Sequence, residues 1–171
     1  MKIKKKSYKD RFLHLALTNP VRISLPEHND PRVKDASKKL NDLGFQIIDI
    51  DQLKINKEKY LELISKKKFT KHWSLDMRND FLNSSLNLSL AALENNDLDC
   101  LVAGAIHPTS EVLRSSIRII GINSNSKWIS SAFFMISPDC KYGYTYADCG
   151  VIPDPNFEQL CNIAYESSKL H

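Results

Sequence analysis

Residues 21–50 read VRISLPEHNDPRVKDASKKLNDLGFQIIDI, and the order of residue types in this stretch decides the fold class. The apolar, β-branched residues 21–25 predict a strand, and the proline- and aspartate-rich residues 26–31 predict a turn. The turn opens onto a helix expected over Arg32–Leu43, which should end at the glycine that follows. Residues 45–50 predict a second strand. The stretch therefore forms one βαβ unit, with its loop at the carboxyl end of the first strand.

The rest of the chain continues this alternation. Further helices are expected near Tyr8–Leu17, over Lys57–Lys68, over Leu75–Glu94, from the loop at 104 to about Arg118, and over Asn156–Leu170. Further strands are expected over residues 100–105, 128–136 and 142–149. The alternation predicts an α/β fold with a largely parallel sheet flanked by helices, and a ligand crevice beyond the carboxyl ends of the strands.

Charge is distributed unevenly along the chain. The formal net charge is +4, but residues 1–71 carry 18 Lys or Arg against 9 acids, whereas residues 72–171 carry 6 against 11. A basic half attracts nucleic acid, an anionic membrane or a phosphorylated small molecule, and composition does not choose among them. The simplest interpretation is lysines on solvated helix faces. With 42% apolar and 26% charged residues, the composition is typical of folded proteins.

The spacing of cysteine and histidine argues against a structural metal. Four cysteines form no CxxC pair, and no spacing would complete a tetrahedral zinc site with the five histidines, so we expect free thiols and no metal. The first lysines are not followed by the apolar core of a signal peptide, and no run approaches the roughly 18 apolar residues of a membrane span. We therefore expect a cytoplasmic chain.

Three ordered blocks of sequence carry a resemblance to a known family. They are LPE and DPRV at 25–27 and 30–33; LVAGAIH at 101–107 with Thr109, VLR at 112–114 and II at 119–120; and SSAFFMI, YADCGVIPDP and EQL at 130–136, 146–155 and 158–160. In this order, the blocks resemble the phosphate acetyltransferase and phosphate butyryltransferase family, the phosphotransacetylases. The resemblance runs from about residue 21 to the end and weakens between about 50 and 80.

The resemblance implies a two-domain α/β architecture like that of isocitrate and isopropylmalate dehydrogenases. Residues 1–122 are expected to form the amino-terminal portion of a first α/β domain, and residues 123–171 the incomplete start of a second. Family members continue well beyond this length. The serine, arginine and aspartate usually assigned to catalysis lie in that further part, so no catalytic residue is expected among these 171.

The reaction that the resemblance implies is the reversible transfer of an acyl group between coenzyme A and inorganic phosphate, which gives an acyl phosphate. Coenzyme A is then a substrate, and no metal or redox cofactor is required. The expected partners are acyl-CoA with phosphate or acyl phosphate, and a second copy in a full-length homodimer, but neither nucleic acid nor membrane. The isolated chain is expected to be inactive, and the preferred acyl group is left open.

The segment 104–114 holds most of the substrate-binding residues that the resemblance implies. Arg114 occupies the arginine position of the VLR element, and a guanidinium binds phosphate bidentately; the alternative is a helix-surface arginine. His107 is expected either to donate to an acyl or phosphate oxygen or to bond the loop backbone. Thr109 and Ser110 are expected either to donate to phosphate or to cap the helix.

Other residues receive supporting roles. Cys140 matches a cysteine near the cleft of some relatives and is expected to line the pocket. Arg118 is a weaker candidate for phosphate binding than Arg114. A family arginine in an LRKxKG-like stretch falls here on Ile64 or Ser65, and the lysines that follow are not bidentate substitutes, so the sequence departs from the family pattern.

Charged residues in the loops are expected to shape the backbone rather than to transfer protons. Glu27, Asp30 and Arg32 are expected to fix the loop after the first strand, and Asp148 and Asp154 to organise turns.

Two other functions compete with an acyltransferase. The first is a catalytically inactive, acyl-CoA-sensing domain like those appended to malic enzymes. The second is a nucleic-acid-binding module, but the sequence contains no recognition-helix motif and no aromatic stacking pattern.

Overall fold

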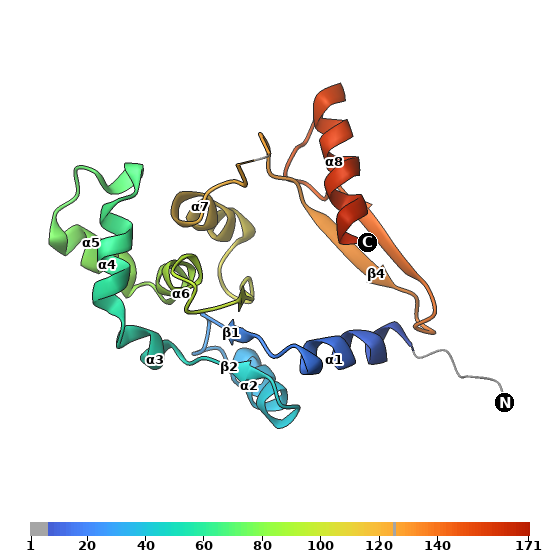
Figure 1. The fold of residues 1–171 in the computed structure, drawn as a ribbon, viewed down its shortest axis with the longest axis horizontal. Coiled ribbons are helices and arrows are strands. Elements are labelled where there is room, and N and C mark those ends of the chain that lie inside the picture. The colour runs from blue at the N-terminus through green and yellow to red at the C-terminus, as the bar shows by residue number, and fades with distance from the viewer. Residues whose placement is uncertain (1–6, 125) are drawn as a thin grey trace. The chain divides into compact units, whose positions relative to one another are not determined.

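The computed structural model describes residues 7–124 and 126–171, which form two compact units (Figure 1). The sheet unit comprises residues 16–121. The hairpin unit comprises the described residues before 16 and after 121. The lysine cluster at the start of the chain lies outside the described residues, and the division into domains 1–122 and 123–171 stays a prediction.

A three-stranded parallel sheet forms the centre of the sheet unit. β1 (Arg22–Ser24) pairs with β2 (Gln46–Ile47) on one side and with β3 (Cys100–Leu101) on the other. Ile23 lies opposite residues of both neighbours and is buried. The central strand is therefore the first strand of the βαβ unit, as residues 21–25 predict.

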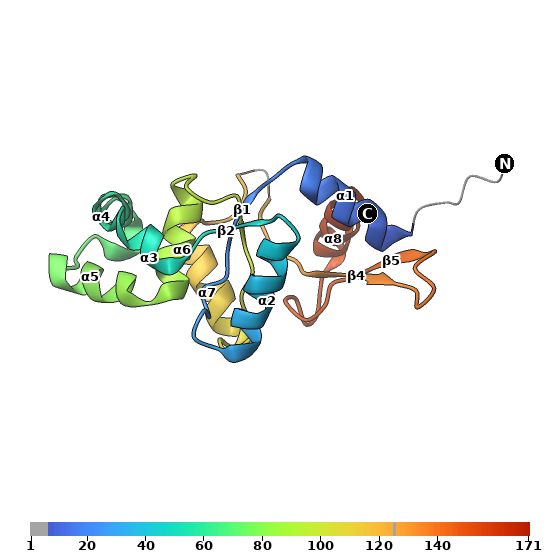
Figure 2. The same cartoon turned by 90° about the horizontal axis from the view of Figure 1, so that it is seen from below.

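Helices cover both sides of this sheet. α2 (Pro31–Asp42) lies on one side, and α6 (Ser85–Glu94) and α7 (Thr109–Ile119), which pack against each other, lie on the other (Figure 2). α2 begins where it does because the Asp30 side chain caps it, accepting the N–H of Arg32 at 2.8 Å, and because proline suits the first helical position. The predicted α/β fold with a parallel sheet flanked by helices is confirmed.

The predicted strand over 45–50 is wrong in its second half because a helix begins there. Asp49 is the N-cap of α3 (Ile50–Lys54), and its backbone N–H donates to Oε1 of Gln52 at 3.0 Å. A glutamine at the third helical position that reaches back in this way is a helix start signal. The strand is therefore limited to two residues.

A run of helices connects β2 to β3. They are α3, α4 (Lys57–Ser65), the short 3-10 turn η1 (Lys68–Thr70), α5 (Leu75–Asn83) and α6. The single helix predicted over Leu75–Glu94 is wrong at Ser84, whose extended backbone separates α5 from α6 and whose hydroxyl accepts the N–H of Asn87. No helix of the described residues is both long and apolar enough to cross a membrane.

The core of the sheet unit lies among these helices. Leu82, Leu86 and Leu90 are at most 1% exposed, and Tyr60 and Ile64 of α4 are fully buried. The leucine stripe is therefore core and not a binding surface, as its helical spacing predicts. Two of the polar groups nearby are paired: the hydroxyls of Ser24 and Ser89 lie 2.9 Å apart, and the hydroxyl of Tyr60 donates to Oδ2 of Asp97 at 2.8 Å.

Shortening one core leucine should test this assignment. We expect Leu90→Ala to lower the free energy of unfolding by about 2–5 kcal/mol, because it leaves a cavity among packed side chains. Leu75→Ala is the matched control, because Leu75 is 60% exposed, and it should cost at most about 0.5 kcal/mol. Urea denaturation followed by circular dichroism measures both, and equal losses would contradict the assignment.

The hairpin unit contains an antiparallel pair of strands covered by helices. β4 (Ala132–Ile136) pairs with β5 (Gly143–Ala147), and α8 (Phe157–Leu170) packs against the hairpin (Figure 1). Tyr8 and Phe12 of α1 (Tyr8–Thr18) pack with ring centroids 6.0 and 5.5 Å from that of Phe134. These strands and helices lie within the predicted segments, except that α1 runs one residue further.

Candidate functional site

Four of the five predicted substrate-binding residues lie in one segment of the sheet unit. His107 is near the end of the loop after β3, Thr109 and Ser110 form the first turn of α7, and Arg114 lies one turn further along. The fifth, Cys140, lies in the hairpin unit, in the turn between β4 and β5. The structure therefore brings four of these residues together in one unit and places Cys140 in the other.

The loop before α7 is held by a buried carboxylate. Glu27 follows β1, is 5% exposed, and accepts the backbone N–H groups of Gly104, Ala105, Ile106 and His107. The N···O distances are 3.1 Å for Gly104, 2.8 Å for Ala105 and Ile106, and 2.7 Å for His107. Consecutive N–H groups that converge in this way form a concave anion site, which a side chain of the same chain fills here.

The predicted strand over 100–105 is longer than the observed one, and the chain turns away at Gly104. The regular strand ends at Leu101, and at Gly104 the backbone has a φ of +113°, which residues with a Cβ rarely adopt. From Gly104 onward, the N–H groups point to Glu27 instead of to a neighbouring strand. The strand prediction is therefore wrong beyond residue 101.

A second contact ties the same loop to the start of α2. Nη2 of Arg32 donates to the carbonyl oxygen of Ala105 at 2.9 Å and to Oδ2 of Asp30 at 2.8 Å. The hydrogen bonds from Arg32 outweigh the effect of burial and lower the pKa of Asp30 to about 2. The contact between Arg32 and Asp30 lies in the loop after the first strand, where both residues are expected to act, and the contact with Ala105 is not expected from the sequence.

The charge state of Glu27 suits an anchor rather than a base. Burial raises the pKa of its carboxyl, but the hydrogen bonds from four backbone N–H groups outweigh burial and lower the pKa below its usual value. A carboxylate that already accepts four hydrogen bonds has no acceptor site left for a substrate proton. Glu27 therefore holds a loop rather than transferring a proton, but the loop is the one at 104–107 and not the expected loop after the first strand.

The amino-terminus of α7 carries no side-chain cap. The N-cap residue is Pro108, and within the described residues the hydroxyls of Thr109 and Ser110 have no hydrogen-bond partner. The capping role that the sequence allows for these hydroxyls is therefore not seen. Both side chains are exposed at the helix end where the backbone dipole is positive, which favours an anion.

One face of α7 packs against the core, and another face is exposed to solvent. Val112 packs against the core and Ile119 is fully buried, so this face fixes the helix in place. Arg114 is exposed and lies one turn after Ser110, and within the described residues its guanidinium makes no ion pair or hydrogen bond. The uncapped helix end and this arginine therefore share one exposed face.

The ring of His107 lies against an acidic side chain of α7. Its Nδ1 is 3.3 Å from Oε2 of Glu111, and its side chain is 23% exposed. Its backbone N–H is taken by Glu27. The ring therefore faces a carboxylate at one nitrogen, while the main chain of the residue belongs to the anchored loop.

The hairpin unit holds Cys140 and the two turn aspartates. Cys140 has a φ of +57° and donates its N–H to the carbonyl oxygen of Ser137 at 2.8 Å. Asp148 accepts N–H groups from Ser131 at 2.6 Å and from Ile152 at 2.5 Å, so it organises its turn as expected. Asp154 is exposed and makes no such contact within the described residues. The pocket-lining role of Cys140 stays a prediction.

The lysines near the missing family arginine are already paired. Lys66 lies 2.6 Å from Glu62, and Lys67 lies 2.5 Å from Glu94. Ile64, one of the two positions on which the family arginine falls, is fully buried. These lysines therefore do not replace the arginine as free cations.

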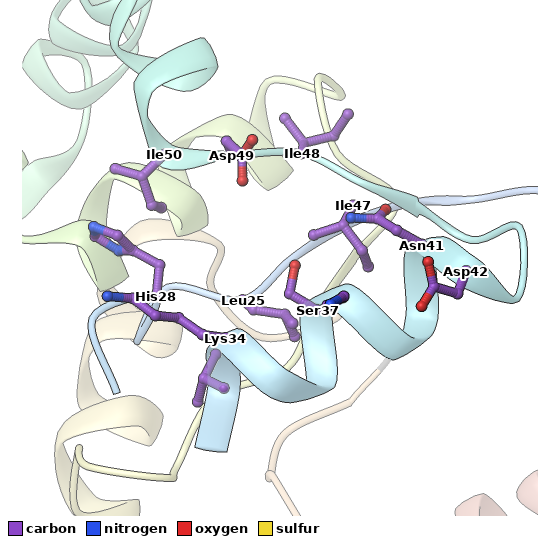
Figure 3. Close-up of a pocket in the computed structure, with 12 residues that line it drawn as sticks. Leu25, His28, Lys34, Ser37, Asn41, Asp42, Ile47, Ile48, Asp49 and Ile50 are labelled. Carbon is purple, nitrogen blue, oxygen red and sulfur yellow. The ribbon is translucent and has the colours of Figure 1, made fainter. Parts of the chain in front are cut away.

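A groove that no sequence pattern indicates lies beside α2. It has a volume of about 420 Å³ and runs between α2 and the chain at 47–50 (Figure 3). Apolar side chains such as Leu25 and Ile47 line it together with Lys34 and Asp49, so charges of both signs border it. None of the predicted substrate-binding residues lines this groove.

Acid should weaken the tie between the loop and α2. Because the pKa of Asp30 is depressed in the folded protein, its charge stabilises the fold above about pH 4, and this contribution is lost as the pH falls towards 2. We expect Asp30→Asn to be less stable than the wild type at pH 7, with the difference shrinking between about pH 4 and 2. Asp35→Asn, exposed on the same helix, is the control. Thermal unfolding across this range measures both, and a difference constant with pH would contradict the ion pair.

The sequence is similar to known proteins over nearly its whole length. The profile of the family described as "Phosphate acetyl/butaryl transferase" matches residues 10–171. The phosphate acetyltransferase of Acetivibrio thermocellus is 26% identical over 190 aligned residues, which cover 95% of this chain and 57% of that protein. The phosphate acetyltransferase of Pseudomonas aeruginosa is 33% identical over 125 residues, which cover 73% of this chain and 17% of that protein.

Solved structures show the same fold. The EutD phosphotransacetylase from Staphylococcus aureus matches 96% of this chain and 58% of its own with a TM-score of 0.75 at 23% identity. A phosphotransacetylase from Streptococcus pyogenes matches 93% of this chain and 56% of its own with a TM-score of 0.70 at 24% identity. The chain spans little more than half the length of these proteins.

Proposed function

This chain belongs to the phosphate acetyltransferase and butyryltransferase family, and from that premise we propose that it serves the reversible transfer of an acyl group between coenzyme A and inorganic phosphate. The observation that carries the proposal is the exposed face of α7, where an uncapped helix end lies together with an arginine that pairs with none of the described residues. Both features attract a phosphoryl group.

Phosphate binding at this face follows from two kinds of donor. The first-turn N–H groups of α7 and the hydroxyls of Thr109 and Ser110 offer hydrogen bonds at the positive end of the helix dipole. Arg114 adds a planar guanidinium, which keeps its charge at any working pH and binds two phosphate oxygens at once. We propose that these groups hold the phosphate or the phosphoryl end of the acyl phosphate.

His107 is proposed to contact the acyl end of the substrate. Only Pro108 separates it from the helix, and Nδ1 of its ring lies near Glu111, which favours a proton on that nitrogen. The other ring nitrogen then faces away as an acceptor when the ring is neutral and as a donor when it is protonated. In the direction of thioester formation, the thiolate of coenzyme A attacks the acyl carbonyl and phosphate departs, so donors near the carbonyl oxygen stabilise the oxyanion.

Coenzyme A is proposed as a substrate, with no metal or redox cofactor. We also propose a cytoplasmic location and a homodimer for the full-length protein, both from the family resemblance. The relatives named above are phosphate acetyltransferases, which does not favour the alternative of an inactive acyl-CoA-sensing domain.

Replacing Arg114 should test the phosphate site. We expect Arg114→Ala to weaken the binding of inorganic phosphate at least about tenfold, because a charge-assisted hydrogen bond contributes about 1.5–3 kcal/mol. Arg118→Ala removes the same charge one turn further along α7 and should change the affinity by less than about threefold. Isothermal titration calorimetry measures both variants. Equal losses of phosphate affinity in the two variants, or no loss in Arg114→Ala, would contradict a phosphate site at Arg114.

The isolated chain should show little turnover. We expect the 171 residues, mixed with acetyl phosphate and coenzyme A, to form no thioester above the uncatalysed background, because the serine, arginine and aspartate that the family resemblance assigns to catalysis are not expected among them. Absorbance of the thioester bond follows the reaction, and a full-length relative serves as the positive control. Robust turnover would show that the base lies among these residues.

A further inference from the structure

The Glu27 carboxylate has the environment of a bound anion. Its two oxygens accept four N–H groups, as many hydrogen bonds as a carboxylate ordinarily accepts, and the side chain is 5% exposed. All four donors come from consecutive backbone positions, 77 to 80 residues further along the chain. The carboxylate therefore fixes a whole loop rather than a single side chain.

The anchored loop leads directly into the proposed phosphate site. The last anchored N–H belongs to His107, two residues before Thr109 opens α7. Only Pro108, whose φ is limited by its ring, lies between the anchor and the helix. A change in the loop at 104–107 is therefore transmitted to the exposed first turn of α7 with little backbone freedom to absorb it.

The Glu27 carboxylate also determines which backbone N–H groups remain available to bind an anion. Four converging N–H groups are themselves an anion site, and an unfilled one would compete with the first turn of α7 for phosphate. Because Glu27 fills it, the exposed donors are those of Thr109 and Ser110, on the face that carries Arg114. The anchor therefore sets both the position and the identity of the available donors.

We propose that Glu27 is a positioning residue for the anionic substrate, acting through the 104–107 loop to place the first turn of α7. This inference rests on the proposed function, because it takes phosphate as the ligand of that turn. It goes beyond the proposed function in giving a specific part to a side chain that does not touch the substrate.

Variants of Glu27 that remove or keep its charge distinguish a role in positioning α7 from a role in the stability of the fold alone. Glu27→Gln keeps the size of the side chain but presents an amide to four donors, and should weaken binding of inorganic phosphate at least about tenfold. Glu27→Asp keeps the charge on a shorter arm and should bind phosphate more tightly than Glu27→Gln. Glu58→Gln makes the same chemical change at an exposed position of α4 and should stay within about twofold of the wild type.

A second variant covers the case in which Glu27→Gln fails to fold. Arg32→Gln removes the contact with the carbonyl oxygen of Ala105, and the Arg32 side chain is 72% exposed, so the core is not disturbed. We expect a smaller loss of phosphate affinity than in Glu27→Gln, but one that exceeds the loss in Glu58→Gln.

The readout is the backbone amide spectrum of the ¹⁵N-labelled chain, titrated with inorganic phosphate. Shifts of the Thr109 and Ser110 amides report binding, and hydrogen exchange of the amides at 104–107 reports the anchor, with the α6 amides as the reference for global stability. We expect exchange at 104–107 to speed up at least about tenfold in Glu27→Gln while α6 is unchanged.

The outcomes distinguish the two proposals. A wild type that binds phosphate at α7, together with a Glu27→Gln variant that folds and binds equally well, overturns the positioning role alone. If Glu27→Gln does not fold, an Arg32→Gln variant that binds as tightly as Glu58→Gln overturns it. A wild type without phosphate-dependent shifts at Thr109 and Ser110 overturns the proposed function and the substrate role of Glu27 with it. In that case, the exchange rates at 104–107 still decide whether Glu27 holds the loop.

Discussion

The loops that follow β1 and β3 in the sheet unit depend on one buried carboxylate. A carboxylate removed from water is costly unless its lone pairs are satisfied, and Glu27 satisfies them with four N–H groups of a single loop. The same bonds remove these N–H groups from strand pairing, so pairing with β1 does not continue past the N–H of Val102, and the chain turns at Gly104. One interaction therefore ends the strand, shapes the loop and sets where α7 begins.

α7 connects this anchored loop to the hydrophobic core. Its inner face is held by Val112 and Ile119, which pack among the leucines of α6, while its outer face presents Ser110 and Arg114 to solvent. An exposed face on a packed helix would lose little side-chain and backbone freedom on binding the proposed anion, which is the advantage of preorganisation. The helix is held at its start by hydrogen bonds and along its length by apolar packing, so the exposed face is fixed from two directions.

The sequence predicts the features that local residue types encode. The aspartate and proline before α2 define its start, and the leucine spacing of α6 predicts its buried face. The sequence does not predict the break between α5 and α6 at Ser84, because the leucine period continues across it. It also does not predict the early end of β2, because Asp49 serves as the cap of the next helix. The motif blocks indicate the family and the segment 104–114. They do not reveal the pairing of Glu27 with that segment, because no local pattern links residues 77 to 80 positions apart.

We propose that the exposed first turn of α7, set by Glu27, receives the phosphoryl group. A crystal structure of the chain grown with inorganic phosphate is the decisive experiment. We expect phosphate within hydrogen-bond distance of the N–H groups of Thr109 and Ser110 and of the Arg114 guanidinium, with Glu27 still bonded to the loop. Phosphate bound at the 104–107 loop in place of Glu27, or only in the groove beside α2, would contradict it.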